Sequence, residues 1–190
     1  MKPGFSALLL AGGASTRMGR PKALLKFEGR PLWRRQAELL QKLGPAELMI
    51  SAGNDWKVEP GPWTLVRDRL PGIGPLGGIA AAMDAMASDL LLVLAVDMPS
   101  MSAGYLGGLL EASGPGGVVP EENGFYHGLA AVYPRSVRAL VAAALGGADH
   151  SLQPILTCAV RDGLIAARPI AAGEWQLFRN VNRPEDLLPQ

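Results

Sequence analysis

One stretch of this sequence decides its fold: residues 5–22, which read FSALLLAGGASTRMGRPK. The apolar run from Phe5 to Ala11 has the length and composition of a buried strand. A loop rich in glycine and basic residues, Gly12 to Lys22, follows at once. Because α/β proteins bind ligands beyond the carboxyl ends of their strands, the backbone N–H groups of such a loop can surround an anion. The stretch therefore predicts an α/β fold with an anion site after its first strand.

Downstream of this stretch, apolar runs alternate with helical patterns. The most continuously apolar run, Leu90 to Val96, is typical of the centre of a mostly parallel sheet that is covered on both faces. Further strands are predicted at residues 47–52, 63–67, 117–120, 128–133 and 177–181, and helices at 31–43, 77–87, 102–112, 134–145 and from Pro184. The alternation predicts one Rossmann-like α/β domain over residues 1–190, with a mostly parallel central sheet flanked by helices.

Composition narrows the classes of function. A chain of 190 residues can bury about 70% of the surface that it exposes when unfolded, so it needs no disulfide or metal to fold. The net charge of +1 provides no basic field, and the apolar runs are too short to span a bilayer, so we expect neither nucleic acid nor membrane as a partner. The single cysteine, Cys158, and only two histidines favour a reduced, cytoplasmic protein without a multi-histidine metal centre.

Two glycine-rich loops compete for the binding role. The first carries Arg17 and Lys22 directly after a buried strand, although it lacks the P-loop pattern and an ordinary solvated loop is the alternative. The second, Gly72 to Gly77, matches Gly-x-Gly-x-x-Gly, and Asp97 lies twenty residues beyond it, as in a Rossmann dinucleotide site. Four residues, 68–71, separate this loop from the third predicted strand, whereas the dinucleotide pattern places its first glycine in the strand-to-helix turn. We therefore favour the first loop.

Asp97 stands at the end of the most apolar strand. A carboxylate in that position is held at the edge of the sheet, where it can bind Mg²⁺ that also contacts substrate phosphates. The alternative is that Asp97 caps the next helix, but Ser100 and Ser102 are better placed for that role. A glycine loop, a basic pair and a metal-binding carboxylate together indicate triphosphate chemistry.

Four motifs occur in order along the chain: residues 10–22 with 29–32, Asp68 with residues 74–79, Asp97-Met98-Pro99, and residues 180–187. In this order they resemble the molybdenum cofactor nucleotidyltransferases, and the guanylyltransferase branch in particular. The resemblance spans nearly the whole chain and implies a single nucleotidyltransferase domain. It further implies transfer of GMP from GTP to molybdopterin, which forms the guanine dinucleotide cofactor and releases pyrophosphate in a Mg²⁺-dependent reaction.

The resemblance also suggests a role for individual residues. Lys22 and Arg17 would act on the triphosphate and the leaving group, and Asp97 would bind both nucleotide and metal. Asn180 or Asn182 would lie on the metal or acceptor side, although turn residues before a last helix are an equal alternative. The residues expected to bind the nucleotide are Leu10, Ala11, Gly12, Gly13, Lys22, Asp68 and Asp97. Because a phosphate nucleophile is already ionised near neutral pH, this chemistry needs positioning and charge stabilisation but no general base.

Other functions remain open at this stage. Arg20-Pro21-Lys22 departs from the guanylyltransferase pattern, so a cytidylyltransferase or another small-acceptor nucleotidyltransferase is the main alternative, and a non-catalytic nucleotide-binding module is another. A labile pterin product would favour transient contact with molybdoenzymes or their chaperones. His127 is expected at the start of a strand on the acceptor side, where a structural role is the alternative, and Cys158 is expected to be a small buried hydrophobe.

Overall fold

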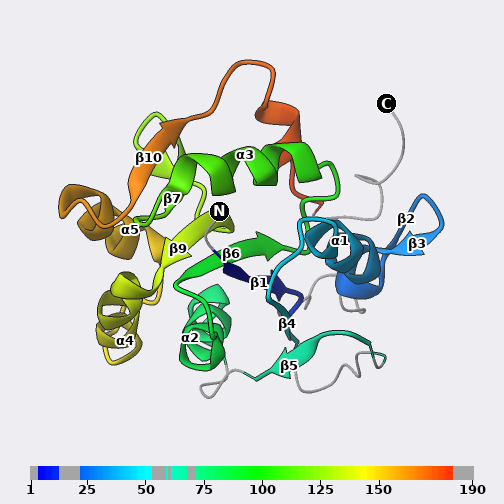
Figure 1. The fold of residues 1–190 in the computed structure, drawn as a ribbon, viewed down its shortest axis with the longest axis horizontal. Coiled ribbons are helices and arrows are strands. Elements are labelled where there is room, and N and C mark those ends of the chain that lie inside the picture. The colour runs from blue at the N-terminus through cyan, green and yellow to red at the C-terminus, as the bar shows by residue number, and fades with distance from the viewer. Residues whose placement is uncertain (1–3, 13–21, 53–58, 60, 68–71, 182–190) are drawn as a thin grey trace.

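The structure is a computed structural model that describes residues 4–12, 22–52, 59, 61–67 and 72–181. Figure 1 shows a central sheet with helices on both faces. This is the predicted α/β architecture. In the described part of the chain, no helix is long and apolar enough to cross a membrane.

The parallel half of the sheet contains the strands that the apolar runs predict. Its members are β1 (Phe5–Leu10), β4 (Glu47–Ser51), β5 (Thr64–Val66) and β6 (Leu90–Ala95). β1 lies between β4 and β6, so that Leu8 pairs with Met49 on one side and Val93 on the other. All six residues of β1 and all six of β6 are buried, as expected for central strands.

The second half of the sheet is mixed. It contains β7 (Val118–Glu122), β8 (Phe125–Tyr126), β9 (Ala130–Pro134) and β10 (Ala166–Pro169). β9 is antiparallel to both β6 and β7, whereas β10 is parallel to β7, and the main strand order is β10-β7-β9-β6-β1-β4-β5. A separate small hairpin is formed by β2 (Lys26–Phe27) and β3 (Arg30–Pro31).

The helices form two layers. Successive side chains of β1 point to opposite faces of the sheet, so Leu9 joins one core cluster and Leu8 joins the other. On the side of Leu9 lie α1 (Leu32–Gln41) and α3 (Ala103–Ser113); on the side of Leu8 lie α2 (Pro75–Ala85), α4 (Arg138–Leu145) and α5 (Leu152–Arg161). The sheet is therefore buried on both faces, as Figure 1 shows.

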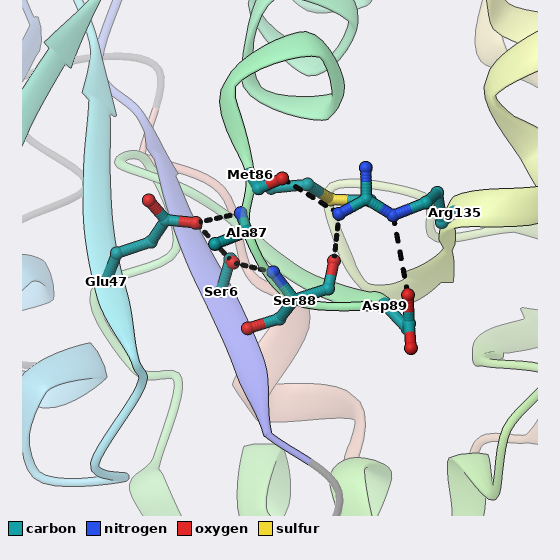
Figure 2. Close-up of polar contacts among 7 residues, drawn as sticks. All are labelled: Ser6, Glu47, Met86, Ala87, Ser88, Asp89 and Arg135. Carbon is teal, nitrogen blue, oxygen red and sulfur yellow. Dashed lines mark hydrogen bonds and ion pairs between the residues drawn. The ribbon is translucent and has the colours of Figure 1, made fainter.

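A polar network closes the amino-terminal edge of the parallel strands (Figure 2). The fully buried Ser6 donates its hydroxyl proton to Glu47 Oε1 over 2.6 Å, and the same oxygen accepts the Ala87 N–H over 2.6 Å. Arg135 donates to the carbonyl oxygens of Met86 and Ser88. These bonds tie the first residues of β1 and β4 to the connection between α2 and β6.

Several expectations need correction. The predicted strand at 177–181 is wrong: Trp175–Phe178 forms the short 3-10 helix η3, whose Phe178 packs into the core. α5 and β10 were not predicted, although Leu152, Ile155, Leu156 and Ala159 follow helical spacing and are buried. Cys158 is half-buried and not fully buried, because it lies on the flank of α5. The helix predicted from Pro184 lies outside the described residues.

Candidate active site

The candidate site lies where β1 and β6 end. The chain runs from β1 outward through β4 and β5, then returns to the other side of β1 as β6. At such a switch point, the connections leaving the two neighbouring strands diverge and leave a crevice at the carboxyl edge of the sheet. Gly12 follows β1 and Asp97 follows β6 closely, so both of these predicted site residues lie at this edge.

The structure brings Lys22 and Asp97 together. Lys22 begins the short 3-10 helix η1 (Lys22–Leu24), and its Nζ lies 3.5 Å from Asp97 Oδ2. Both side chains are mostly buried, with 27% and 20% of their surfaces exposed. Asp97 Oδ1 is buried and has no hydrogen-bond partner among the described residues. Since a buried carboxylate oxygen without a partner is costly, this atom is suited to a ligand that supplies positive charge or a donor.

Helix α1 holds the segment that follows Asp97. The fully buried Gln36 donates from Nε2 to the carbonyl oxygen of Met98, and Arg35 Nε donates to the carbonyl oxygen of Pro99 over 3.3 Å. The hydroxyl of Ser102 accepts the Tyr105 N–H over 3.2 Å and caps α3, as expected. The carboxylate of Asp97 is therefore not used as that cap.

The end of the described chain also reaches Asp97. The Val181 N–H donates to the Asp97 carbonyl oxygen over 2.8 Å, which places the exposed Asn180 one residue away from this contact. The backbone of Asn180 therefore lies near that of Asp97, and its expected place on the metal or acceptor side stays a prediction. Asn182, Arg17, Gly13 and Asp68 lie outside the described residues.

The backbone after β1 is already engaged. The N–H groups of Ala11 and Gly12 both donate to the Ser51 carbonyl oxygen over 2.8 Å, and the Leu10 carbonyl oxygen accepts the Val96 N–H over 3.0 Å. These bonds lock the ends of β1, β4 and β6 together. Contacts from Ala11 and Gly12 to a ligand would therefore use their carbonyl oxygens, not the N–H groups that a phosphate needs.

The second glycine loop is the entrance to α2. Gly72 and Gly74 have φ angles of 86° and 71°, and Pro75 then occupies the first turn of the helix. A Cβ atom on Gly78 would lie 2.7 Å from both Leu10 Cδ2 and Ser51 Oγ, so α2 packs directly against the strand ends at the site. This loop comes after the short edge strand β5 and before α2, so it does not follow one of the two strands of the switch point directly.

Comparison with known proteins identifies the family. Residues 7–162 match the model of the MobA-like NTP transferase domain. The chain belongs to this family. Among curated relatives, it is 37% identical over 189 residues to a probable molybdenum cofactor guanylyltransferase of Opitutus terrae, covering 96% of this chain and 92% of the relative. It is 32% identical over 189 residues to a protein of the same description from Bacillus subtilis, covering 94% and 90%.

Solved structures agree on the fold. Molybdopterin-guanine dinucleotide biosynthesis protein A from Archaeoglobus fulgidus superposes with a TM-score of 0.73 at 22% identity, over 96% of this chain and 94% of that one. The 2-C-methyl-D-erythritol 4-phosphate cytidylyltransferase from Thermus thermophilus gives 0.68 at 19% identity, over 95% and 94%. The α/β nucleotidyltransferase fold implied by the four motifs is thereby confirmed.

Within this MobA-like site, the sequence did not reveal the role of α1. Arg35 and Gln36 position the Asp97 segment by bonding to its carbonyl oxygens, yet neither belongs to a motif. The available signal was Gln36 itself, a polar residue on the otherwise apolar face of an amphipathic helix. Among the described residues, no group of three or more His, Cys, Asp or Glu side chains is arranged to hold a metal.

Proposed function

We propose that this protein transfers GMP from GTP to molybdopterin, releasing pyrophosphate and forming the guanine dinucleotide cofactor. The observation that carries the proposal is the Lys22–Asp97 pair at the switch point between β1 and β6. Relatives described as molybdenum cofactor guanylyltransferases match about 95% of the chain, which supports GTP and molybdopterin as the substrates. We treat residues 1–190 as one nucleotidyltransferase domain.

The reaction needs two phosphates held in line. An oxygen of the molybdopterin phosphate attacks the α-phosphorus of GTP, the new P–O bond forms, and the bond to the bridging β-phosphate oxygen breaks. The electron pair leaves with pyrophosphate. Because the attacking phosphate is already ionised near pH 7, no side chain has to remove a proton, and the protein acts by positioning and by charge stabilisation.

Lys22 is the cation that the described site offers to the triphosphate. Its ammonium group is held beside the Asp97 carboxylate and is mostly shielded from water. The group is therefore already in position when the substrate arrives. We assign it to the charge that develops on the α- and β-phosphates as pyrophosphate leaves. Arg17, in the same loop, is assigned to the leaving group, and Asp68 to the nucleotide pocket.

Asp97 has the chemistry of a magnesium ligand. Mg²⁺ prefers one or two carboxylates together with phosphate and water oxygens, and Asp97 Oδ1 is a buried carboxylate oxygen without a partner among the described residues. Asp97 therefore fits the metal, with Asn180 or Asn182 beside it. When bound, Mg²⁺ would neutralise phosphate charge. The pairing of Lys22 with Oδ2 leaves Oδ1 for this role.

The backbone at the end of β1 suggests how the nucleotide base is held. Ala11 and Gly12 have already used their N–H groups within the fold, so their carbonyl oxygens, with Leu10 and Gly13 beside them, would face the N–H donors of a base. We propose a cytoplasmic enzyme that hands its product to molybdoenzymes or their chaperones by transient contact.

The decisive experiment measures pyrophosphate release with Mg²⁺, molybdopterin and each of GTP, CTP, ATP and UTP in turn. We expect turnover with GTP, with the guanine dinucleotide product identified by mass spectrometry. Turnover with CTP in place of GTP would move the protein to the cytidylyltransferase branch. Nucleotide binding without turnover in any mixture would indicate a binding module and overturn the proposal.

A further inference from the structure

A cluster of aromatic rings lies beside the candidate site and has no role in the mechanism above. The ring of His127 lies between Phe125 and Phe178, with centroid distances of 5.2 Å and 4.7 Å. Phe125 is 53% exposed, the largest fraction among the exposed large hydrophobic side chains of the described residues. Its open ring is therefore available to a flat ligand, and the rings of His127 and Phe178 lie behind it.

The β7–β8 hairpin aligns the cluster. Asn123 and Gly124 have φ angles of 49° and 82°, as a two-residue type I′ turn requires. This turn pairs Glu122 with Phe125, and alternation along the strand puts His127 on the same face. The Asn-Gly turn thus presents a carboxylate, a phenyl ring and an imidazole together.

The cluster is linked to Asp97 by two short segments. The Ala95 N–H donates over 2.8 Å to the carbonyl oxygen of Leu129, two residues after His127. On the other side, Val181 follows Phe178 by three residues and donates to the Asp97 carbonyl oxygen. Lys22 contacts Asp97 on the side of β1, whereas this cluster lies toward β9 and β7, on the other side of β6. Two substrates could therefore meet at Asp97 from opposite sides.

Two polar side chains of the cluster, His127 and Glu122, can form further hydrogen bonds. His127 Nε2 is buried without a hydrogen-bond partner among the described residues, and at 3.8 Å it is too far from Glu122 Oε2 for a hydrogen bond. Burial lowers the pKa of His127, against the opposing influence of Glu122 and Glu121, so the imidazole is neutral near pH 7. The Glu122 side chain is 38% exposed and can accept hydrogen bonds from a ligand.

We propose that Phe125, Glu122 and His127 form the subsite that binds the pterin ring of the acceptor, an inference that rests on the proposed function. A pterin is a flat heterocycle, and its aminopyrimidinone edge carries neighbouring N–H and NH2 donors. The exposed face of Phe125 stacks on the ring, while the Glu122 carboxylate accepts from both donors. His127 supports Phe125 from behind and offers Nε2 to the ring edge.

The test compares binding of molybdopterin to the wild type, Phe125→Ala and Glu122→Gln by titration calorimetry, which requires no turnover. We expect Phe125→Ala to weaken molybdopterin binding about tenfold or more through lost stacking, and Phe125→Tyr to restore it. Glu122→Gln should weaken binding by about tenfold or more, because an amide cannot accept from both donors. The control is Leu65→Ala, another exposed apolar side chain, on the distant edge strand β5.

The outcomes separate this inference from the proposed function. Guanylyl transfer by the wild type with unchanged molybdopterin binding in Phe125→Ala and Glu122→Gln would overturn the subsite alone. Weakened molybdopterin binding in these variants without guanylyl transfer in the wild type would support the subsite and overturn the proposed function. If the variants raise the KM for GTP and leave molybdopterin binding unchanged, the cluster binds the nucleotide base and the proposal is wrong.

Discussion

The two edges of the parallel sheet are built in opposite ways. At the amino-terminal edge, the Ser6 hydroxyl and Glu47 Oε1 are hydrogen-bonded to each other and to the neighbouring backbone, as Figure 2 shows. At the carboxyl edge, Asp97 keeps a buried oxygen without a partner among the described residues, beside the ammonium group of Lys22. Saturated polar groups stabilise a fold, whereas incompletely paired ones are ready for a ligand. We therefore expect substitutions at the amino-terminal edge to lower stability and substitutions at the carboxyl edge to lower activity.

The largest expected effect is at Asp97. Asp97→Asn should lower guanylyl transfer by about 10³-fold, because it removes the charge proposed to hold the metal, an interaction worth several kcal/mol. The free energy of unfolding should change little. The matched control is Asp89→Asn, since Asp89 precedes the same strand at the opposite edge and is 93% exposed. Steady-state kinetics and urea unfolding of both variants test the contrast, which fails if Asp89→Asn is equally inactive.

The second largest effect on turnover is expected at Lys22. Lys22→Ala is expected to reduce turnover on the order of 10²-fold, the scale associated with a fixed donor to the transition state. Lys26→Ala, which removes an exposed lysine from the nearby strand β2, should retain normal turnover. Near-normal activity of Lys22→Ala would remove this residue from its assigned role.

The amino-terminal edge should show the reverse behaviour. Glu47→Ala leaves the buried Ser6 hydroxyl without its acceptor and the Ala87 N–H without its partner, so it should cost about 2 kcal/mol of unfolding free energy. Turnover of the folded fraction should be unchanged. In chemical denaturation, the double variant with Ser6→Ala should cost less than the sum of the two single changes, since both remove the same bond. Strict additivity would contradict the network.

The smallest expected effect concerns pH. Burial lowers the pKa of His127, so the unfolded chain takes up a proton at about pH 6.5 while the folded chain resists it. This contribution to stability is present above that pH and is lost as the pH falls below it. Urea unfolding at pH 7 and pH 5.5 should show a drop of less than about 1.4 kcal/mol that shrinks in His127→Gln. Equal drops in both proteins would show that His127 does not set this dependence.

Local sequence patterns predicted most helices and strands, because the apolar residues that these elements bury form runs or recur at a regular spacing. The continuous apolar runs predicted β1 as a buried strand and β6 as a strand at the centre of the sheet, and Pro31 and Gly44 delimited the predicted helix that contains α1. The pattern failed near the end, where Leu177 and Phe178 look like a strand but form part of η3. The burial of Phe178 comes from packing against Tyr105 and His127, residues distant in sequence whose contacts no local periodicity records.

The hairpin that carries Phe125 has a local sequence signal in its turn. Asn123-Gly124 is the preferred pair for a type I′ turn, and it lies between residues that can extend. The turn signal does not show that the hairpin lies near the site. β8 reaches the carboxyl edge of the sheet only because β9 pairs antiparallel with both β6 and β7.

The sequence alone predicted the fold class correctly and proposed Lys22 and Asp97 as candidate site residues, because strand burial and glycine loops depend on neighbouring residues. Only the tertiary structure decided that Lys22 and Asp97 meet, since 75 positions separate them and their 3.5 Å contact requires β1 and β6 to pair. It also decided that Gln36 and Arg35 hold the Asp97 segment in place. Hydrogen bonds between distant segments depend on how helices pack on the sheet, which no short stretch of sequence specifies.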